Sequence, residues 1–233
     1  MKRKREPFHQ KTASHQKQDG FAFTFLVILF LFFSSLLIFS GFIGNYIAKE
    51  DWEFDRMAIS FMNRIRSQML THLFKGITFT GNFLSVVIIT LVIAGVLIYF
   101  KKTKQALFFS LNVLGLWLFN EMLKQVFRRP RPLEPRLVHV SGYSFPSGHS
   151  MVFMGLSAWV IYYILRNVRN RRMAVLISIL ILIYAVLVGL SRVYLGVHYF
   201  SDVLAGWTIG ILWVLASISL HKKLELAQND KKI

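Results

Sequence analysis

The sequence predicts an all-α fold, an integral membrane bundle of six transmembrane helices with an interfacial amphipathic helix between the first and second spans. Two observations support this prediction. Hydrophobic residues make up 55% of the 233 residues and charged residues only 17%, whereas ordinary soluble domains carry about 25% charged residues. The apolar residues also gather into six runs, each close to the roughly 20 residues that a helix needs to cross a bilayer core.

The six predicted spans are residues 21–44, 83–100, 106–123, 149–165, 173–190 and 203–220. The first run follows four basic residues at positions 2–5. It is longer than the apolar region of a signal peptide, so we expect an uncleaved span. The sequence therefore predicts one six-span domain over residues 21–220, between a basic cytoplasmic tail at 1–20 and a second cytoplasmic tail at 221–233.

The net charge of +17 would indicate a nucleic-acid-binding protein if the chain were soluble. Most of the Lys and Arg residues instead form short clusters between apolar runs, so the expected partner is the membrane and not nucleic acid. An even number of spans places both termini on the same side. Because 17 of the 28 Lys and Arg residues then fall on that side, the positive-inside rule predicts cytoplasmic termini.

The longest segment between predicted spans, residues 45–82, contains a helical pattern. Apolar residues recur at helical spacing, and polar residues take the opposite face; the apolar set is Ala58, Met62, Ile65, Met69 and Leu73. This pattern predicts an amphipathic helix on the outer membrane surface. A short helix packed on the bundle explains the pattern equally well.

Three short motifs lie in the segments that the predicted topology places on the outer side. They read Lys124-x6-Arg131-Pro132, Pro146-Ser147-Gly148-His149 and Ser191-Arg192-x5-His198-x3-Asp202. In the third motif, His198 and Asp202 are four residues apart and share a face if the segment is helical. Asp202 can then accept a hydrogen bond from one ring nitrogen, which leaves the other nitrogen as a nucleophile or base. A purely structural His–Asp pair is the alternative.

The other two motifs are suited to binding an anion. Ser147 is a candidate N-cap, Gly148 permits close backbone approach, and the helix start offers free N–H groups to an anion. His149 can donate a proton there. Lys124 adds a point charge and Arg131 a planar bidentate donor, both of which suit phosphate. Each motif alone fits an ordinary cap or basic loop, but together they predict an anion site beside an activated histidine.

In this order and spacing, the three motifs are those of the type 2 phosphatidic acid phosphatase superfamily, and the chain resembles its six-span bacterial members over most of residues 21–220. The resemblance implies that His198 attacks phosphorus and forms a phosphohistidine. It implies that Asp202 orients His198, and that His149 protonates the leaving oxygen and then activates water.

The resemblance also implies that five residues bind the substrate phosphate, namely Lys124, Arg131, Ser147, Gly148 and Arg192. It implies no metal and no cofactor, because the cationic side chains take the place of a metal. The absence of Cys from the sequence independently excludes Cys-ligated metal sites.

The implied function is that of a membrane lipid phosphatase with its active site on the extracytoplasmic face. Undecaprenyl diphosphate and a glycerophospholipid phosphate, such as phosphatidylglycerophosphate or phosphatidic acid, are the candidate substrates. An anionic-lipid transporter or flippase that uses the same basic site without hydrolysis is the alternative. A vanadium-dependent haloperoxidase would have a similar site, but six spans argue against it.

Four charged residues near the first motif lie outside the signature. Arg128, Arg129 and Arg136 either bind a second phosphate, which would favour a diphosphate substrate, or contact solvent and anionic lipid. Glu121 precedes Lys124 by three residues, so the two side chains can form an ion pair on a helix.

Overall fold

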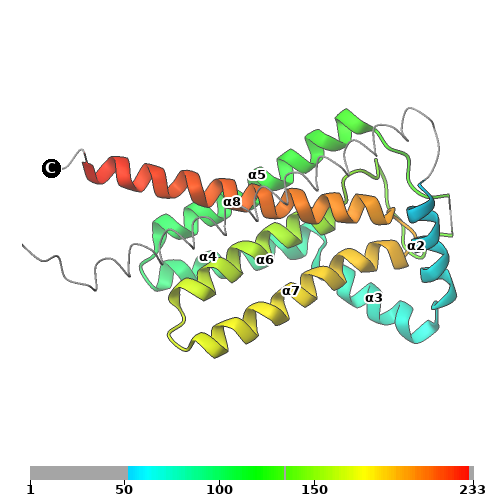
Figure 1. Cartoon of the computed structure of the whole chain (residues 1–233), viewed down its shortest axis with the longest axis horizontal. Helices are drawn as coiled ribbons and strands as arrows, with labels where there is room; N and C mark the ends of the chain where they lie inside the picture. The colour runs from blue at the N-terminus through cyan, green and yellow to red at the C-terminus, as the bar shows by residue number, and fades with distance from the viewer. Residues whose placement is uncertain (1–51, 134, 231–233) are drawn as a thin grey trace, which may run out of the picture.

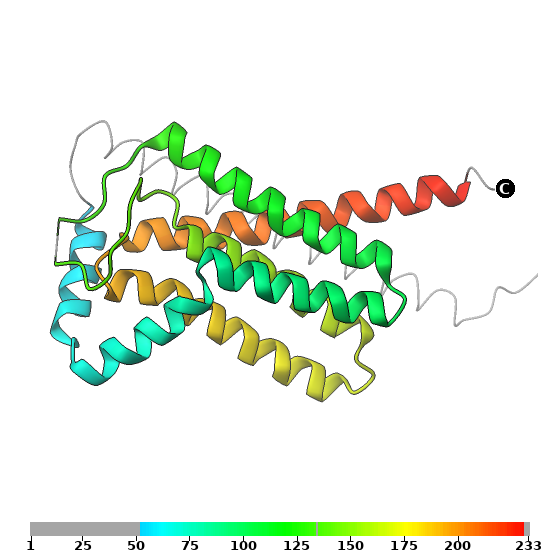
Figure 2. The same ribbon diagram turned by 180° about the vertical axis from the view of Figure 1, so that it is seen from behind.

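The computed structural model describes residues 52–133 and 135–230, with side chains described up to residue 220. This part contains seven helices, labelled as in Figure 1: α2 (Glu53–Arg64), α3 (Gln68–Thr80), α4 (Phe83–Tyr99), α5 (Thr103–Phe127), α6 (Gly148–Asn167), α7 (Arg171–Tyr194) and α8 (Phe200–Asp230). Helices α4 to α8 run along the molecule, whereas α2 and α3 lie at the end opposite the C-terminus (Figures 1 and 2). The described residues contain no strand, and the predicted all-α fold is confirmed.

Five of the six predicted spans coincide with helices, and the predicted first span at 21–44 lies outside the described residues. Helices α5, α6 and α7 and the part of α8 from Phe200 to Leu220 are each long and apolar enough to cross a membrane. Helix α4 has only 17 residues. Together with α3 it passes the same test as one broken span, bent by 54°. The count of six spans therefore remains a prediction.

The amphipathic segment before α4 forms two helices, so the expectation of one continuous helix is wrong. Ser67 interrupts it, because its hydroxyl accepts a hydrogen bond from the backbone N–H of Leu70 at 3.2 Å and starts α3 as an N-cap. The interpretation as helices packed on the bundle is confirmed, whereas a position on the outer membrane surface stays a prediction. Helices α2 and α3 pack against α7, while Phe61 and Met69 on the same segment remain exposed.

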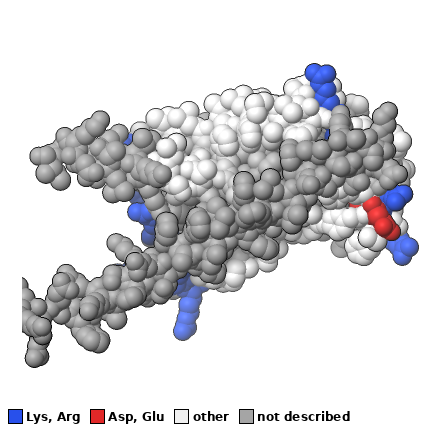
Figure 3. Space-filling view, turned by 45° about the horizontal axis from the view of Figure 1, so that its top comes forward, with Lys and Arg blue, Asp and Glu red and all other residues white. Residues whose placement is uncertain are grey.

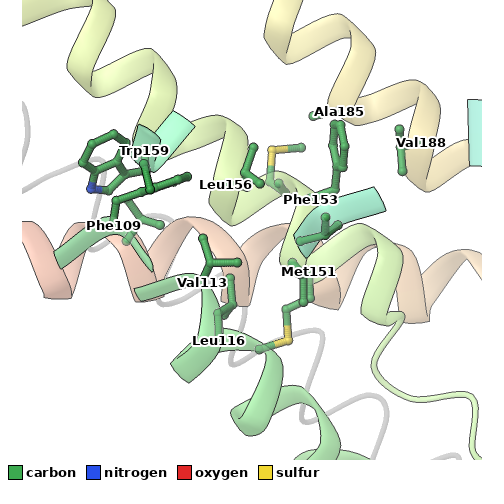
Figure 4. Packing of buried hydrophobic residues seen from close by; sticks show 14 of the residues in the cluster. Phe109, Val113, Leu116, Met151, Phe153, Leu156, Trp159, Ala185 and Val188 are labelled. Carbon is green, nitrogen blue, oxygen red and sulfur yellow. The ribbon is translucent and has the colours of Figure 1, made fainter. Parts of the chain in front are cut away.

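The core lies around α6, which packs against α5, α7 and α8. Figure 4 shows the interlocking side chains, which come from three helices: Phe109, Val113, Leu116, Met151, Phe153, Leu156, Trp159, Ala185 and Val188. Phe109 and Met151 are fully buried. Such packing defines one arrangement of the helix ends, where the polar motifs lie.

Small residues bring α8 close to the beginning of α6. A Cβ atom on Gly206 would lie 2.9 Å from the carbonyl oxygen of Ser147, and one on Gly210 would lie 2.5 Å from that of Met151. This Gly-x3-Gly spacing is typical of closely packed helices in membranes. It places the first turns of α6 and α8, which carry His149 and Asp202, at the same end of the bundle.

The surface between the two ends is apolar. On the face drawn in Figure 3, the charged side chains lie toward the ends of the molecule, with an uncharged region between them. Large hydrophobic side chains are exposed along this length, including Leu91 on α4 and Leu180 on α7. This is the surface of a bundle embedded in a membrane.

Candidate active site

The three motifs meet at the end of the bundle that contains α2 and α3. Their side chains come from the end of α5, the following loop, the first turn of α6, the end of α7 and the segment that enters α8. His149 on α6 interacts electrostatically with four of them, Lys124, Arg131, Arg192 and His198. Residues up to 74 positions apart in the sequence therefore form one basic site, as the motifs predict.

Asp202 holds one side of the His198 ring. Its Oδ2 atom lies 3.4 Å from Nδ1 of His198 and accepts a hydrogen bond from the Ser144 hydroxyl at 2.5 Å. The same oxygen accepts from the backbone N–H of Tyr199 at 3.0 Å. Because α8 begins only at Phe200, His198 lies before the helix, and the pair forms across its first turn rather than along one helical face.

The other ring nitrogen, Nε2, faces a cation. Nη1 of Arg131 lies 3.0 Å from Nε2 of His198. A guanidinium can only donate, so Nε2 carries the lone pair and the ring proton is on Nδ1, facing Asp202. Arg131 is held in place by hydrogen bonds to the carbonyl oxygens of Val197 at 2.8 Å and of Ser141 and Gly142, both at 3.0 Å.

Burial keeps the His198 imidazole neutral. It lowers the pKa of His198 to about 4, and the positive charges of Arg192 and Arg131 act in the same direction, whereas Asp202 opposes them. Burial also lowers the pKa of Arg131 from its usual value. At neutral pH the site therefore presents an uncharged imidazole with a lone pair, surrounded by cationic side chains.

His149 is positioned by the break between α3 and α4. Its Nε2 atom lies 2.9 Å from Oδ1 of Asn82, the residue directly before α4. A Cβ atom on Gly81 would lie 2.8 Å from Cδ2 of His149 and 2.9 Å from Cγ1 of Val188. Glycine at this break therefore lets the chain pass directly against the imidazole.

Lys124 pairs with Glu121, as the spacing suggests, with Nζ 2.7 Å from Oε1. It also reaches the beginning of α6. A Cβ atom on Gly148 would lie 3.5 Å from Nζ of Lys124 and 2.9 Å from Oδ1 of Asn120. That Asn120 oxygen is buried and has no hydrogen-bond partner among the residues that the structure describes. Gly148 thus keeps α6 close to the polar end of α5.

Arg192 and Ser147 are both buried at the site. Nη1 of Arg192 donates to Thr78 on α3 at 2.6 Å, while its buried Nε–H has no acceptor within the described part of the chain. Ser147 is the N-cap residue of α6, as predicted, but its side chain makes no capping hydrogen bond. Its hydroxyl accepts from Ser150 at 2.9 Å instead, and its backbone N–H donates to the carbonyl oxygen of Asp202 at 3.1 Å.

Arg129 lies inside the protein, so the interpretation that it contacts solvent and anionic lipid is wrong. Its side chain binds Oδ1 of Asp202 at 2.6 Å and Oδ2 of Asp55 at 3.0 Å. Burial alone lowers the pKa of Arg129, but the two carboxylates raise it by more than burial lowers it. Arg128 and Arg136 instead lie at the surface and bond to carbonyl oxygens of their own segment.

Comparison with known proteins agrees with this geometry. Residues 105–225 match the model of the PAP2 superfamily. Phosphatidylglycerophosphatase B of Bacillus subtilis is 34% identical over 190 residues, which cover 80% of this chain and 89% of that protein. Undecaprenyl-diphosphatase of Sulfolobus acidocaldarius is 30% identical over 148 residues, covering 57% of this chain and 66% of that protein.

A solved structure is also similar. The crystal structure of a transmembrane PAP2-type phosphatidylglycerolphosphate phosphatase from Bacillus subtilis superposes with a TM-score of 0.73 and 30% sequence identity, covering 84% of this chain and 96% of that one. The family expected from the three motifs is therefore confirmed. The chain belongs to the PAP2 superfamily, as a membrane phosphatase of that family.

Proposed function

We propose that the protein hydrolyses the phosphate head group of a membrane lipid through a phosphohistidine intermediate, at the extracytoplasmic face of the membrane. The substrate is a lipid phosphomonoester or diphosphate, of the class of phosphatidylglycerophosphate, phosphatidic acid or undecaprenyl diphosphate. The names of the similar proteins, a phosphatidylglycerophosphatase and an undecaprenyl-diphosphatase, support both substrate types.

The observation that carries this proposal is a cavity that joins the catalytic end to the apolar part of the bundle. It has a volume of about 350 Å³ and lies between α4, α5 and α6. Lys124, Gly148 and His149 line its polar end. Most of its wall is apolar and includes Val86, Leu91, Val113, Leu114, Trp117 and Val152. A molecule with a phosphate head and a hydrocarbon tail matches this distribution.

The first chemical step is attack by His198. Its Nε2 lone pair forms a bond to phosphorus while the bond from phosphorus to the leaving oxygen breaks. His149, in its protonated form, gives a proton to that oxygen. Asp202 stabilises the positive charge that the His198 ring acquires, since Nδ1 lies 3.4 Å from its Oδ2 atom.

The second step releases phosphate. His149, now neutral, takes a proton from water, the water oxygen attacks phosphorus, and the P–N bond to His198 breaks. In both steps Lys124, Arg131 and Arg192, with the hydroxyl of Ser147 and the backbone N–H of Gly148, balance the charge on the phosphate oxygens. The proposal includes no metal, because these cations supply the positive charge.

A transporter for anionic lipids would need the basic site but not the nucleophile. The arrangement around His198, with one nitrogen facing Asp202 and a lone pair on the other, favours hydrolysis. The phosphatase names of the similar proteins point in the same direction.

The test is phosphate release by the purified full-length protein in detergent, with a chelator present. Wild type, His198→Ala and His139→Ala are compared on the three candidate lipids and on a soluble sugar phosphate. We expect His198→Ala to reduce release by at least about a thousandfold. His139→Ala is the matched control, because His139 is exposed. No release from any lipid by folded wild type would overturn the proposal, and equal rates on the sugar phosphate would overturn its lipid specificity.

A further inference from the structure

We propose that Asp55 and Arg129 are positioning residues of the active site. Arg129 bridges the carboxylates of Asp55 and Asp202, and this bridge sets both the orientation and the net charge that Asp202 presents to His198. The inference rests on the function proposed above and assigns residues outside the three motifs to the same reaction.

The contacts of Arg129 explain how Asp202 is oriented. Nη1 of Arg129 donates to Oδ1 of Asp202 at 2.6 Å, and Nη2 donates to Oδ2 of Asp55 at 3.0 Å. The guanidinium carbon lies 3.9 Å from the centre of the Tyr199 ring, so an aromatic face covers the planar group. A rigid fork that holds two carboxylates in fixed directions is an arrangement that Lys cannot reproduce.

The two oxygens of Asp202 therefore have separate partners. Oδ1 faces Arg129, whereas Oδ2 lies near Nδ1 of His198 and accepts from Ser144 and Tyr199. Rotation of the carboxylate would break bonds on both sides. Arg129 therefore fixes the plane of the Asp202 carboxylate, and with it the direction from Oδ2 to the imidazole of His198.

Asp55 attaches the beginning of α8 to α2. It is fully buried, and its Oδ1 accepts from the backbone N–H of Ser201 at 2.8 Å, while its Oδ2 accepts from the Ser201 hydroxyl at 2.6 Å. A carboxylate that accepts from the first turn of a helix is favoured by the partial positive charge there. Ser201 directly precedes Asp202, so α2 fixes the residue next to the catalytic carboxylate.

The bridge also determines the local charge. Arg129 and Asp202 alone would form a neutral pair, but the second carboxylate makes the cluster of Asp55, Arg129 and Asp202 net negative by one charge. The other charged and titratable groups that act on His198 are Arg131, Arg192 and His149. Asp55 thereby preserves negative charge behind a ring that becomes positive when it binds phosphorus.

The experiment compares Asp55→Asn, Arg129→Gln and the double variant in the purified full-length protein. Each is assayed for kcat and KM on phosphatidylglycerophosphate, and the pKa of His198 is followed by NMR of ¹⁵N-labelled histidine, assigned with His198→Gln. We expect kcat to fall about tenfold to a hundredfold in both single variants, the effect of losing a hydrogen bond to a charged group. KM should change little, because neither residue lines the cavity.

The pKa of His198 separates a positioning role from a merely structural one. Removal of a negative charge in Asp55→Asn should lower this pKa, whereas removal of a positive charge in Arg129→Gln should raise it. The double variant restores the net charge, so its pKa should return toward the wild-type value while kcat stays low. Asp55→Asn keeps the ion pair between Arg129 and Asp202, so this variant leaves no buried charge unpaired and protects the test against unfolding.

Exposed neighbours serve as controls. Glu53→Gln on α2 and Arg128→Gln beside Arg129 remove the same charges at the surface and should change neither kcat nor the pKa of His198. Lower kcat in the single variants with no opposite movement of the pKa would overturn the inference. If wild type hydrolyses none of the lipids but the pKa moves as expected, the proposed function fails and the bridge between Asp55 and Asp202 stands.

Discussion

Arg131 donates a hydrogen bond to Nε2 of His198 across 3.0 Å, so the proposed phosphate ligand and the proposed nucleophile are in direct contact. Two further bonds from this guanidinium go to the carbonyl oxygens of Ser141 and Gly142, which lie in the same loop between α5 and α6. A phosphate oxygen that binds Nη1 takes the place of Nε2 as acceptor. In the proposed mechanism, substrate binding by Arg131 and exposure of the Nε2 lone pair of His198 are therefore coupled at this contact.

Replacement of Arg131 by Ala should lower kcat/KM by about a hundredfold or more, because charge-assisted bonds to the transferring phosphate are lost. Arg131→Lys keeps the charge but loses the planar fork, and should retain an intermediate rate. All variants are compared by their rate of phosphate release from one lipid monophosphate. Arg136→Ala is the matched control, because Arg136 is exposed and its guanidinium donates to the carbonyl oxygen of Pro132 in its own loop. Equal rates for wild type and Arg131→Ala would contradict the role assigned to this guanidinium.

Asn82→Ala should slow the steps that depend on His149. The amide oxygen lies 2.9 Å from Nε2 of His149 and makes no capping bond to α4, so its removal acts on the histidine rather than on the helix end. We expect kcat to fall about tenfold. The loss should be smaller for a p-nitrophenyl phosphate ester, whose leaving group needs no proton. A uniform loss on good and poor leaving groups would show that Asn82 does not act through proton transfer.

Gly81→Ala should damage the site by displacement of His149. The added methyl would lie 2.8 Å from the imidazole and 2.9 Å from Val188, closer than van der Waals contact allows. We expect about 1–3 kcal/mol lower stability or a comparable loss of activity. Gly76→Ala on α3 is the control, since a Cβ atom there meets nothing within 4 Å. Thermal unfolding in detergent and phosphate release are measured for both variants. Identical results for Gly81→Ala and Gly76→Ala would contradict the close contact between Gly81 and His149.

The pH dependence of kcat/KM should reflect the neutral form of His198. Its pKa is lowered to about 4, so protonation removes the nucleophile only as the pH falls through that value. Activity should therefore persist on the acid side of pH 6.5, the usual midpoint for His. The profile is measured from pH 3.5 to 7 and corrected for ionisation of the substrate phosphate. An acid limb near 6.5 that belongs to His198 would mean that water reaches the imidazole.

The sidedness of the site can be tested by cysteine labelling, because the sequence contains no Cys and has no background. His139→Cys lies in the loop between α5 and α6 near the site, and Arg169→Cys lies between α6 and α7 at the other end; both positions are exposed. A membrane-impermeant maleimide applied to intact cells should label only His139→Cys. Arg169→Cys should react after permeabilisation. The reverse pattern would place the active site in the cytoplasm.

The sequence predicts the helices and the motif residues because both depend on local pattern. Five apolar runs became helices, and residues with fixed spacing came together where those helices end. The turn at Ser67 was missed because apolar residues keep a helical spacing on both sides of it. Ser67 then stops the helix through a single side-chain bond. The spacing of apolar residues alone does not reveal such an N-cap.

The residues that support the site were missed for a different reason. Arg129 stands in the run Arg128-Arg129-Pro130-Arg131, where charge alone does not tell which guanidinium turns inward. Asp55 lies on the apolar side of its helix, three residues before Ala58 and seven before Met62, a position that indicates burial but does not identify the partner. Asn82 looks like an ordinary helix-start residue. Each of these residues acts through a partner that is far away in the sequence. The spacing of nearby residues does not indicate which residue that partner is.

The bond from Ser201 to Asp55 spans 146 positions of the sequence. A ribosome therefore completes α2 long before the helix that Asp55 will cap. His198 and Asp202 also emerge late, after Arg129, Arg131 and Ser144, the residues of the loop between α5 and α6 that contact them. The nascent chain therefore contains the cations of the site and His149, the proposed proton donor, before it contains His198, the proposed nucleophile. If His198 is the nucleophile, as proposed, we expect no hydrolysis before α8 has docked on α2 through Asp55 and Ser201.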